Sequence, residues 1–178
     1  MVGGVRVFIA CSIDGFIAGA DDDLSWLPAP DPSGEDYGYG AFIAETAAIL
    51  MGRSTYDVAA GFPNWPYGSL PVFVATSRPL DPVVETVVPI SGSPPELLAT
   101  VHARSDGAVY LDGGALIRSF LDEGLVDELT VTIVNVILGR GSPLFAGVGR
   151  RHRLALASAM PYPSGLVQLR YAPEPAES

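Results

Sequence analysis

The chain has 178 residues, of which 48% are hydrophobic and 17% charged, a composition typical of one ordered globular domain. Its formal net charge of −10 argues against a nucleic-acid or an anionic-membrane partner. All ten basic residues are arginines, so a Schiff-base lysine and a phosphate-loop lysine are both excluded.

Cysteine and histidine are scarce. The only cysteine is Cys11, which rules out an intrachain disulfide and favours a cytoplasmic location. His102 and His152 together with that one thiol cannot form a conventional zinc site, so we expect no metal centre. The sequence shows neither an apolar run near the roughly 20 residues of a membrane span nor a signal-peptide pattern, so we expect no membrane partner.

Short apolar runs alternate along the chain with segments of helical periodicity. The predicted strands cover residues 5–11, 48–51, 70–75, 85–88, 108–111 and 128–138, and a closing hairpin joins residues 153–160 to 166–171. The predicted helices cover residues 42–48, a segment that starts at 52, residues 93–103 behind a capping-box pattern, and residues 115–121.

This alternation predicts an α/β fold with a mainly parallel mixed sheet, helices on both faces and a C-terminal antiparallel hairpin. No internal repeat or linker is visible, so we expect a single domain over residues 1–178. The polar, proline-containing tail at residues 172–178 is expected to be disordered.

The central motif is the predicted strand 108–111, which leads through Asp112, Gly113 and Gly114 into a helix. A strand that enters a helix through paired glycines exposes backbone N–H groups at the positive end of the helix dipole, where a phosphate can bind. The two glycines can instead form only a tight turn, and the GxGxxG dinucleotide fingerprint is missing.

Two other predicted strands also end in small, polar or arginine-bearing turns, in the motifs MGRSTYD (51–57) and TSRPL (76–80). Ligands of open α/β sheets bind outside the carboxyl ends of the strands. Together with SIDGFIA (12–18), LDGGALI (111–117), LVDELTVTIV (125–134) and LGRGSPLF (138–145), these motifs resemble the dihydrofolate-reductase-like three-layer fold. The chain is most similar to the reductase domain of bifunctional riboflavin deaminase-reductases and its stand-alone relatives, over residues 5–171.

The resemblance implies NADPH in an extended pose, with its nicotinamide at the first strand and its pyrophosphate between two helix starts. The implied cofactor-binding residues are Ala10, Ile17, Gly52, Arg53, Ser54, Thr55, Thr76, Ser77, Arg78, Gly113, Gly114, Ala115 and Leu116. Arg53 and Arg78 are expected to converge on the 2′-phosphate, because guanidinium groups donate paired hydrogen bonds to phosphate. The alternative is that both arginines are solvated surface charges.

The family also implies an unusual, cis peptide bond between Gly113 and Gly114 and a homodimer. The apolar segment 129–138, expected near a sheet edge, supports the dimer, because an exposed strand of that length needs a cover.

The source of a proton is less evident from the sequence. Dihydrofolate reductases carry an acidic residue in the first helix that protonates the pterin, and the matching position here falls near Gly38. Asp36, Tyr37 and water are therefore the candidate proton sources, whereas Asp14 is interpreted as a turn former.

Two aromatic residues, Trp26 and Phe42, are candidate walls of a substrate pocket, although Phe42 suits the core equally well. Phe16 stands where the riboflavin-pathway reductases usually carry lysine, which argues against a phosphoribosyl substrate. The leading hypothesis is an NADPH-dependent reductase of a small pteridine-like or aminouracil-like heterocycle, acting by hydride transfer. A nucleotide-binding protein of the same fold without catalysis, and a true dihydrofolate reductase, are the alternatives.

Overall fold

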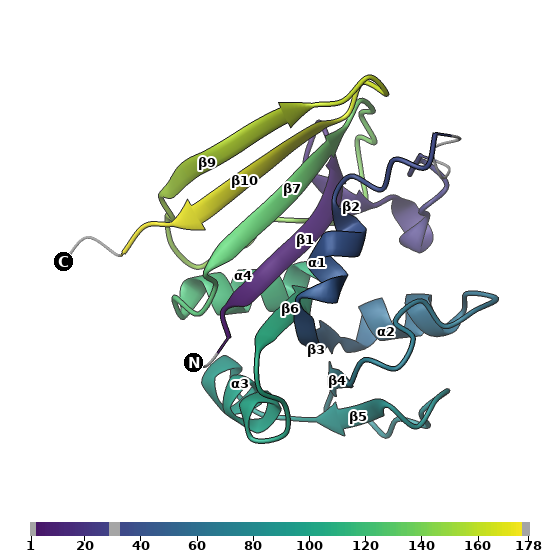
Figure 1. Ribbon diagram of the computed structural model, residues 1–178, viewed down its shortest axis with the longest axis vertical. Coiled ribbons are helices and arrows are strands. Elements are labelled where there is room, and N and C mark those ends of the chain that lie inside the picture. The colour runs from purple at the N-terminus through teal and green to yellow at the C-terminus, as the bar shows by residue number, and fades with distance from the viewer. Residues whose placement is uncertain (1–2, 29–32, 176–178) are drawn as a thin grey trace.

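The computed structural model describes residues 3–28 and 33–175 (Figure 1). The strands are β1 (Val5–Ser12), β2 (Phe16–Ala18), β3 (Thr46–Gly52), β4 (Val72–Ala75), β5 (Val87–Ile90), β6 (Ala108–Asp112), β7 (Glu128–Val134), β8 (Ser142–Pro143), β9 (Leu154–Pro161) and β10 (Val167–Pro173). The helices are α1 (Tyr39–Ala44), α2 (Arg53–Ala60), α3 (Pro94–His102) and α4 (Gly114–Asp122), with a short 3-10 helix η1 (Ala20–Asp22).

Eight strands form one sheet in the order β5-β4-β3-β6-β1-β7-β10-β9. Every neighbouring pair from β5 to β7 is parallel, and β10 joins β7 and β9 through antiparallel ladders. β2 and β8 form a separate antiparallel pair beside the main sheet. The mainly parallel mixed sheet and the C-terminal hairpin are therefore confirmed.

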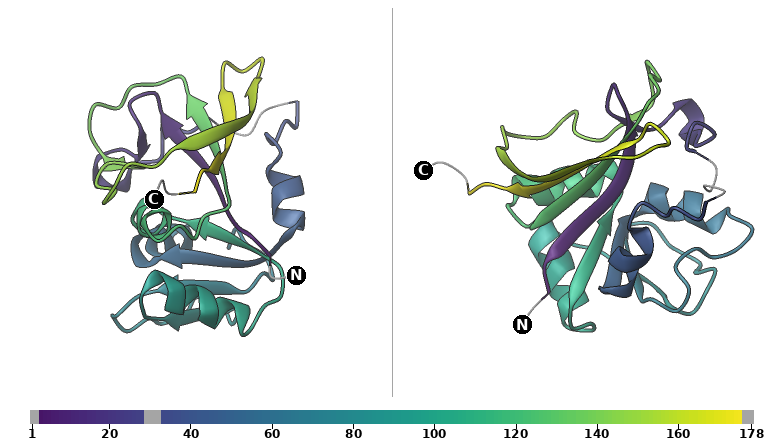
Figure 2. Two further views of the ribbon diagram at one scale, coloured as in Figure 1. Left: turned by 90° about the vertical axis from the view of Figure 1, so that its left-hand side faces the viewer. Right: turned by 45° about the horizontal axis from the view of Figure 1, so that its top comes forward.

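The helices cover both faces of the parallel part of the sheet (Figures 1 and 2). β3 shows why, since Ala48 and Leu50 point into the hydrophobic core beneath α3 and α4, while Ile49 and Met51 point into the core beneath α1 and α2. All four side chains are fully buried, as expected for a central parallel strand that is apolar on both sides. The predicted three-layer architecture is thus confirmed.

The predicted boundaries were wrong in three places. The expected helix 42–48 ends at Ala44, and β3 begins at Thr46, because pairing with β6 overrides the helical spacing there. The expected strand 128–138 stops at Val134, where the Val136 N–H turns back to the Val134 carbonyl. The tail expected to be disordered is ordered at Ala172 and Pro173, which extend β10, and residues 176–178 lie outside the described residues.

β7 also lies inside the sheet, between β1 and β10, so segment 129–138 is not the exposed strand near a sheet edge that was expected. The edge strand on this side of the sheet is β9, whose residues are mostly exposed, including Leu156 and Met160. No helix among residues 3–28 and 33–175 combines the length and the apolar composition that a membrane crossing needs.

Candidate active site

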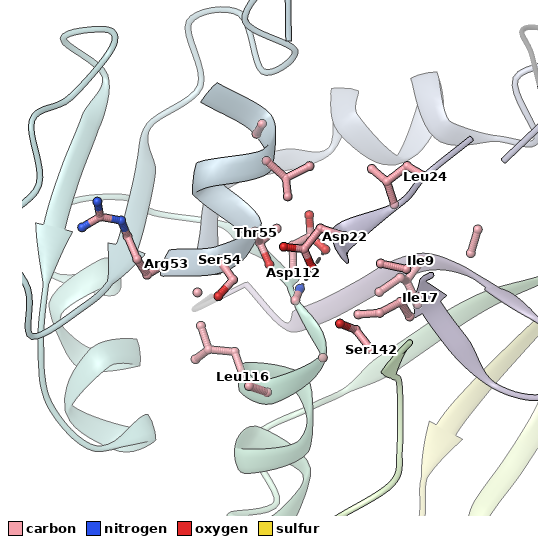
Figure 3. Close-up of a pocket in the computed structure, with 18 of the residues that line it drawn as sticks. Ile9, Ile17, Asp22, Leu24, Arg53, Ser54, Thr55, Asp112, Leu116 and Ser142 are labelled. Carbon is pink, nitrogen blue, oxygen red and sulfur yellow. Dashed lines mark hydrogen bonds between the residues drawn. The ribbon is translucent and has the colours of Figure 1, made fainter. Parts of the chain in front are cut away.

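A cavity of about 510 Å³ opens along the carboxyl ends of β1, β3 and β6 (Figure 3). These are adjacent central strands of the sheet, and the turns that follow β3 and β6 lead directly into α2 and α4. The cavity therefore lies where open α/β sheets place their ligands. Ten of the predicted cofactor-binding residues line it: Ala10, Ile17, Gly52, Arg53, Ser54, Thr55, Gly113, Gly114, Ala115 and Leu116.

Two helix N-termini border this cavity. α2 starts after Gly52 and α4 starts after Gly113, and at neither end does a side chain cap the first backbone N–H groups. Unpaired N–H groups at a helix start attract anions, because they donate hydrogen bonds and carry the positive end of the helix dipole. The cavity thus presents two anion-binding ends from adjacent parallel strands.

Gly113 has a backbone conformation that favours glycine, with φ +96° and ψ 128°. A Cβ atom here would collide with the Thr55 hydroxyl oxygen, so the start of α2 packs directly on this glycine. The Gly113–Gly114 peptide is trans, so the cis expectation was wrong, and the positive φ of Gly113 makes the turn instead.

The Gly114 backbone is just as closely surrounded. Its missing Cβ would meet the Pro143 carbonyl oxygen at 2.9 Å and Ile17 at 3.1 Å. The pair of β2 and β8 therefore closes against the glycine turn, and this contact brings Ile17 into the cavity wall.

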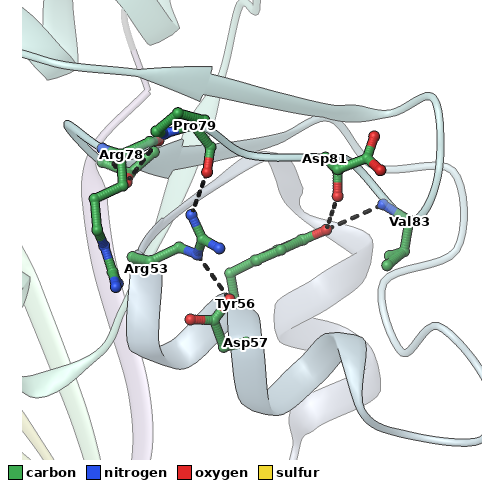
Figure 4. Close-up of polar contacts among 8 residues, drawn as sticks. Arg53, Tyr56, Asp57, Arg78, Pro79, Asp81 and Val83 are labelled. Atoms are coloured by element: carbon green, nitrogen blue, oxygen red, sulfur yellow. Dashed lines mark hydrogen bonds and ion pairs between the residues drawn. The ribbon is translucent and has the colours of Figure 1, made fainter.

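Arg53 lines the cavity at the start of α2, and its guanidinium reaches the turn that carries Arg78 and Pro79 (Figure 4). The Arg53 guanidinium donates to the Asp57 carboxylate at 2.7 Å and to the Pro79 carbonyl at 2.9 Å. Arg78 precedes Pro79 and is exposed, and no carboxylate among residues 3–28 and 33–175 forms an ion pair with it. Arg53 is held by other groups, and the convergence of the two arginines on a 2′-phosphate stays a prediction.

Asp112 brings a carboxyl group into the cavity wall at the end of β6. Its Oδ1 atom accepts a hydrogen bond from the Gly113 N–H at 2.8 Å, and the Tyr67 hydroxyl donates to Oδ2 at 3.4 Å. Burial raises the pKa of Asp112 to about 6, and the hydrogen bonds from Gly113, Tyr110 and Tyr67 offset only part of that rise. In the sequence this residue stands out only as the end of a strand, and no role was expected for it.

The turn between β1 and β2 is organised by Asp14, as expected. Its carboxylate accepts hydrogen bonds from the Ser12 hydroxyl at 2.6 Å and from the backbone N–H groups of Leu138 and Gly139. These bonds lower the pKa of Asp14, the one from Ser12 most. Asp14 ties the β1–β2 turn to the segment after β7 and does not line the cavity.

The candidate proton sources also lie outside the cavity lining. The Asp36 carboxylate accepts hydrogen bonds from the N–H groups of Gly40 and Gly38 at the start of α1, which lower its pKa. Tyr37 packs its ring edge-on against Tyr162, at 4.8 Å between centroids. Asp36 thus caps a helix as a stable anion, which makes it a poor proton donor.

The remaining candidates are distributed around the fold. Phe42 is buried in the core, where its ring contacts Phe8 and Tyr110, so it is a core residue. Trp26 donates its indole N–H to the Asp23 carbonyl and does not line the cavity. Residues 29–32, shortly after Trp26 in the sequence, lie outside the described residues.

Thr76 and Ser77, like Arg78, are not part of the cavity lining. The Thr76 hydroxyl accepts from the Arg78 N–H at 3.1 Å and so shapes the turn after β4. Residues that the sequence reasoning did not assign complete the wall, among them Asp22, Leu24, Leu27, Tyr67, Asp112 and Arg118.

Comparison with known proteins agrees with this architecture. The family model of the RibD C-terminal domain matches residues 4–168. The chain belongs to this family. The expected resemblance is confirmed, and within the family the chain is 32% identical over 167 residues to the uncharacterized protein YwjB of Bacillus subtilis strain 168, covering 93% of this chain and 95% of YwjB.

Two solved structures have the same fold as this chain. A candidate riboflavin biosynthesis protein of Shewanella sp. PV-4 is 32% identical, with a TM-score of 0.88 over 97% of this chain and 99% of that one. Dihydrofolate reductase of Enterococcus faecalis, complexed with NADP(H) and RAB-propyl, is 18% identical, with a TM-score of 0.67 over 97% of this chain and 98% of that one. The fold is therefore dihydrofolate-reductase-like and typical of reductases.

Proposed function

We propose that the chain is an NADPH-dependent reductase of a small heterocycle. The observation that carries the proposal is the pair of uncapped helix starts, α2 and α4, that border one cavity across a glycine turn. A pyrophosphate fits this arrangement, because two helix N-termini can each bind one of its anionic groups. The NADP(H) bound to the Enterococcus faecalis enzyme of the same fold supports the choice of a nicotinamide cofactor.

The proposed cofactor would lie along the carboxyl ends of the central strands. Its nicotinamide would rest against Ala10 and Ile17, and the backbone N–H groups of the two helix starts would hold the pyrophosphate. Ser54 is exposed at the start of α2, so its hydroxyl can donate to a phosphate oxygen there.

When bound, NADPH would supply the hydride, and the protein would supply orientation and a largely apolar pocket. The substrate end of the cavity is lined by Phe8, Leu24, Leu27 and Tyr67 among others, and a flat ring suits such a surface. Within the described part of the chain, the two arginines that line the cavity are both engaged, Arg53 with Asp57 and the Pro79 carbonyl, and Arg118 with the carbonyls of Pro143 and Leu144. An uncharged pteridine-like or aminouracil-like ring suits the cavity better than a phosphorylated substrate.

NADPH differs from NADH by its 2′-phosphate, so a variant that lacks the proposed 2′-phosphate ligand tests which of the two cofactors the protein prefers. Arg78 is exposed and unpaired within the described part of the chain, and Arg53 stands next to it. Charge-assisted hydrogen bonds contribute about 1.5–3 kcal/mol each, so Arg78→Ala should weaken NADPH binding by roughly tenfold or more. Binding of NADH, which has no 2′-phosphate, should change little.

Calorimetric titration of both cofactors measures this difference. Arg104→Ala is the matched control, because it removes another exposed arginine from the loop after α3, outside the cavity. Arg53→Ala should weaken NADPH binding as well, but it also frees Asp57 and the Pro79 carbonyl. If Arg78→Ala weakened NADPH and NADH equally, the 2′-phosphate assignment would be wrong.

Catalysis itself is tested by NADPH oxidation with a panel of pteridines, quinones and aminouracils. Turnover with any of them supports a reductase. The position of Asp36 outside the cavity favours a second candidate function, a nucleotide-binding protein without catalysis. Tight NADPH binding without oxidation across the whole panel is the result expected for that second candidate.

A further inference from the structure

A single arginine joins helix α4 to the short strand β8. The Arg118 side chain leaves α4 one turn after the start of the helix and is partly buried in the cavity wall. Its Nη1 atom donates to the Pro143 carbonyl at 2.7 Å and to the Leu144 carbonyl at 3.2 Å. Hydrogen bonds from a charged donor are stronger than those between neutral groups, so this contact holds β8 firmly against the helix.

The pair of strands that receives these bonds is short. β2 has three residues and β8 has two, and they form a sheet of their own beside the eight-stranded one. Just after β8, the Leu144 N–H adds a bond to the Gly15 carbonyl at 2.9 Å. A two-stranded ladder is at best marginally stable in water, even at ordinary strand lengths. Contacts with the rest of the protein must therefore fix the position of the β2–β8 pair.

The first residue of α4 is the point where these contacts meet. A Cβ atom on Gly114 would lie 2.9 Å from the Pro143 carbonyl oxygen, 3.0 Å from the Arg118 guanidinium and 3.1 Å from the end of the Ile17 side chain. The missing side chain thus lets both strands of the pair approach the helix backbone. Arg118 fixes β8 at the place where α4 begins.

The β2–β8 pair supplies the part of the cavity wall that is proposed to face the nicotinamide. Ile17 of β2 and Ser142 of β8 both line the cavity (Figure 3). Neither residue belongs to the eight-stranded sheet, so their positions depend on how the pair is held. The start of α4 is proposed to hold the pyrophosphate. Arg118 therefore links the wall at the nicotinamide end to the helix at the pyrophosphate end.

We propose that Arg118 is a positioning residue for the nicotinamide end of the cofactor. The inference rests on the proposed function and adds to it a residue that acts through Ile17 and Ser142, without a bond of its own to the nicotinamide. The apparent affinity of a ligand falls with the fraction of molecules whose site is correctly formed. Loss of the charge-assisted bonds to β8 should lower that fraction by about tenfold.

The first test needs no ligand, because hydrogen exchange of the full chain measures how often the β2–β8 pair opens. In Arg118→Met, the Leu144 amide should exchange about tenfold faster, since it bonds across to the β1–β2 turn. The Leu125 amide, which is bonded at the end of α4, should keep its rate if the helix is intact. Arg104→Met, the same change on an exposed arginine outside the cavity, should alter neither rate. An unchanged Leu144 rate in Arg118→Met would overturn the proposal.

The second test compares NADPH with 2′-phospho-ADP-ribose, which keeps the 2′-phosphate and the pyrophosphate but lacks the nicotinamide. In calorimetric titrations, Arg118→Met should weaken the binding of NADPH by about tenfold, whereas the binding of 2′-phospho-ADP-ribose should barely change. Arg104→Met should bind both ligands as the wild-type protein does. Equal weakening of both ligands in Arg118→Met would show that the arginine binds the pyrophosphate or supports the fold, and would overturn the positioning role. Unchanged binding of both would overturn it as well.

A third measurement uses only the wild-type protein, so it does not depend on the folding of a variant. NADPH should slow the exchange of the Leu144 amide, because the nicotinamide would pack against the β2–β8 pair, and 2′-phospho-ADP-ribose should not. Equal protection by both ligands would overturn the assignment of this pair to the nicotinamide end, and with it the role of Arg118. A wild-type protein that binds neither ligand contradicts the proposed function itself.

Discussion

The buried carboxyl group of Asp112 makes a specific prediction for stability. Its pKa is raised from 3.8 to about 6 in the folded protein, so the folded state binds more protons than the unfolded chain between these values. The contribution of Asp112 to stability is therefore most favourable below pH 4 and falls as the pH rises through 6. Above pH 6 the Asp112 carboxyl group is ionised in both states, but its charge is desolvated in the folded protein and hydrated in the unfolded chain.

The free-energy cost of the ionised Asp112 follows from its pKa shift of about two units. At about 1.4 kcal/mol per unit, the charge lowers the free energy of unfolding by about 3 kcal/mol at pH 7.5. Asp112→Asn removes the charge and keeps an oxygen that can accept from the Gly113 N–H. The contact with Tyr67 must reverse its direction, which costs about 1 kcal/mol. A net gain of about 2 kcal/mol should raise Tm by about 4–8 °C for a chain of this size.

Thermal unfolding at pH 7.5 and pH 4.0, followed by circular dichroism, measures the effect. The gain should be present at pH 7.5 and nearly absent at pH 4.0, where the wild-type carboxyl group is protonated in the folded state. Asp106→Asn, on an exposed residue, should show no such pH-dependent gain. A stabilisation of equal size at both pH values, or a loss at pH 7.5, would refute the reasoning about desolvation.

Three further predictions concern the glycine turn, the β1–β2 turn and assembly. Gly113→Ala should destabilise the fold by about 1–3 kcal/mol and weaken NADPH binding, because its Cβ would meet Thr55 at a positive φ. Denaturant titration measures the stability and calorimetry the binding, and wild-type values of both would contradict the packing of Thr55 on this glycine. Asp14→Ala should lower Tm by more than Asp14→Asn, since the amide keeps one acceptor oxygen; equal Tm values in scanning calorimetry would argue against the carboxylate as the organiser of the turn. We also propose a homodimer through the edge strand β9, where Leu156 and Met160 are more than half exposed. Analytical ultracentrifugation should give a dimer mass for the wild-type protein and a monomer mass for Leu156→Arg. A monomeric wild-type protein at micromolar concentration would refute the proposal.

Local sequence patterns predicted much of this architecture because the relevant physics is local. Residues 48–51 pack against the helices on both faces of the sheet, so every position in this stretch is apolar, a pattern that predicts a buried strand. Ser93 and Glu96 cap α3 with the reciprocal hydrogen bonds that their spacing predicts. The paired Gly113 and Gly114 similarly marked the turn between β6 and α4.

The errors and omissions involve contacts between distant parts of the chain. Burial raises the pKa of Asp112, and the hydrogen bond from Tyr67, 45 residues away, offsets only part of that rise. Neither the burial nor this contact is visible from the sequence neighbours of Asp112. Asp36 was a plausible acid by position, but the N–H groups of Gly38 and Gly40 make it a helix cap. The order of strands, which puts β7 inside the sheet, likewise depends on the return of β10 beside it.

The most direct test of the central claim is a crystal structure of the complex with NADPH. The account predicts an extended cofactor with its pyrophosphate between the starts of α2 and α4 and its nicotinamide against Ala10, within reach of the Asp112 side of the cavity. The 2′-phosphate should contact the Arg78 guanidinium. NADPH bound elsewhere on the protein, or a cavity that stays empty in crystals soaked with the cofactor, would contradict the proposed function.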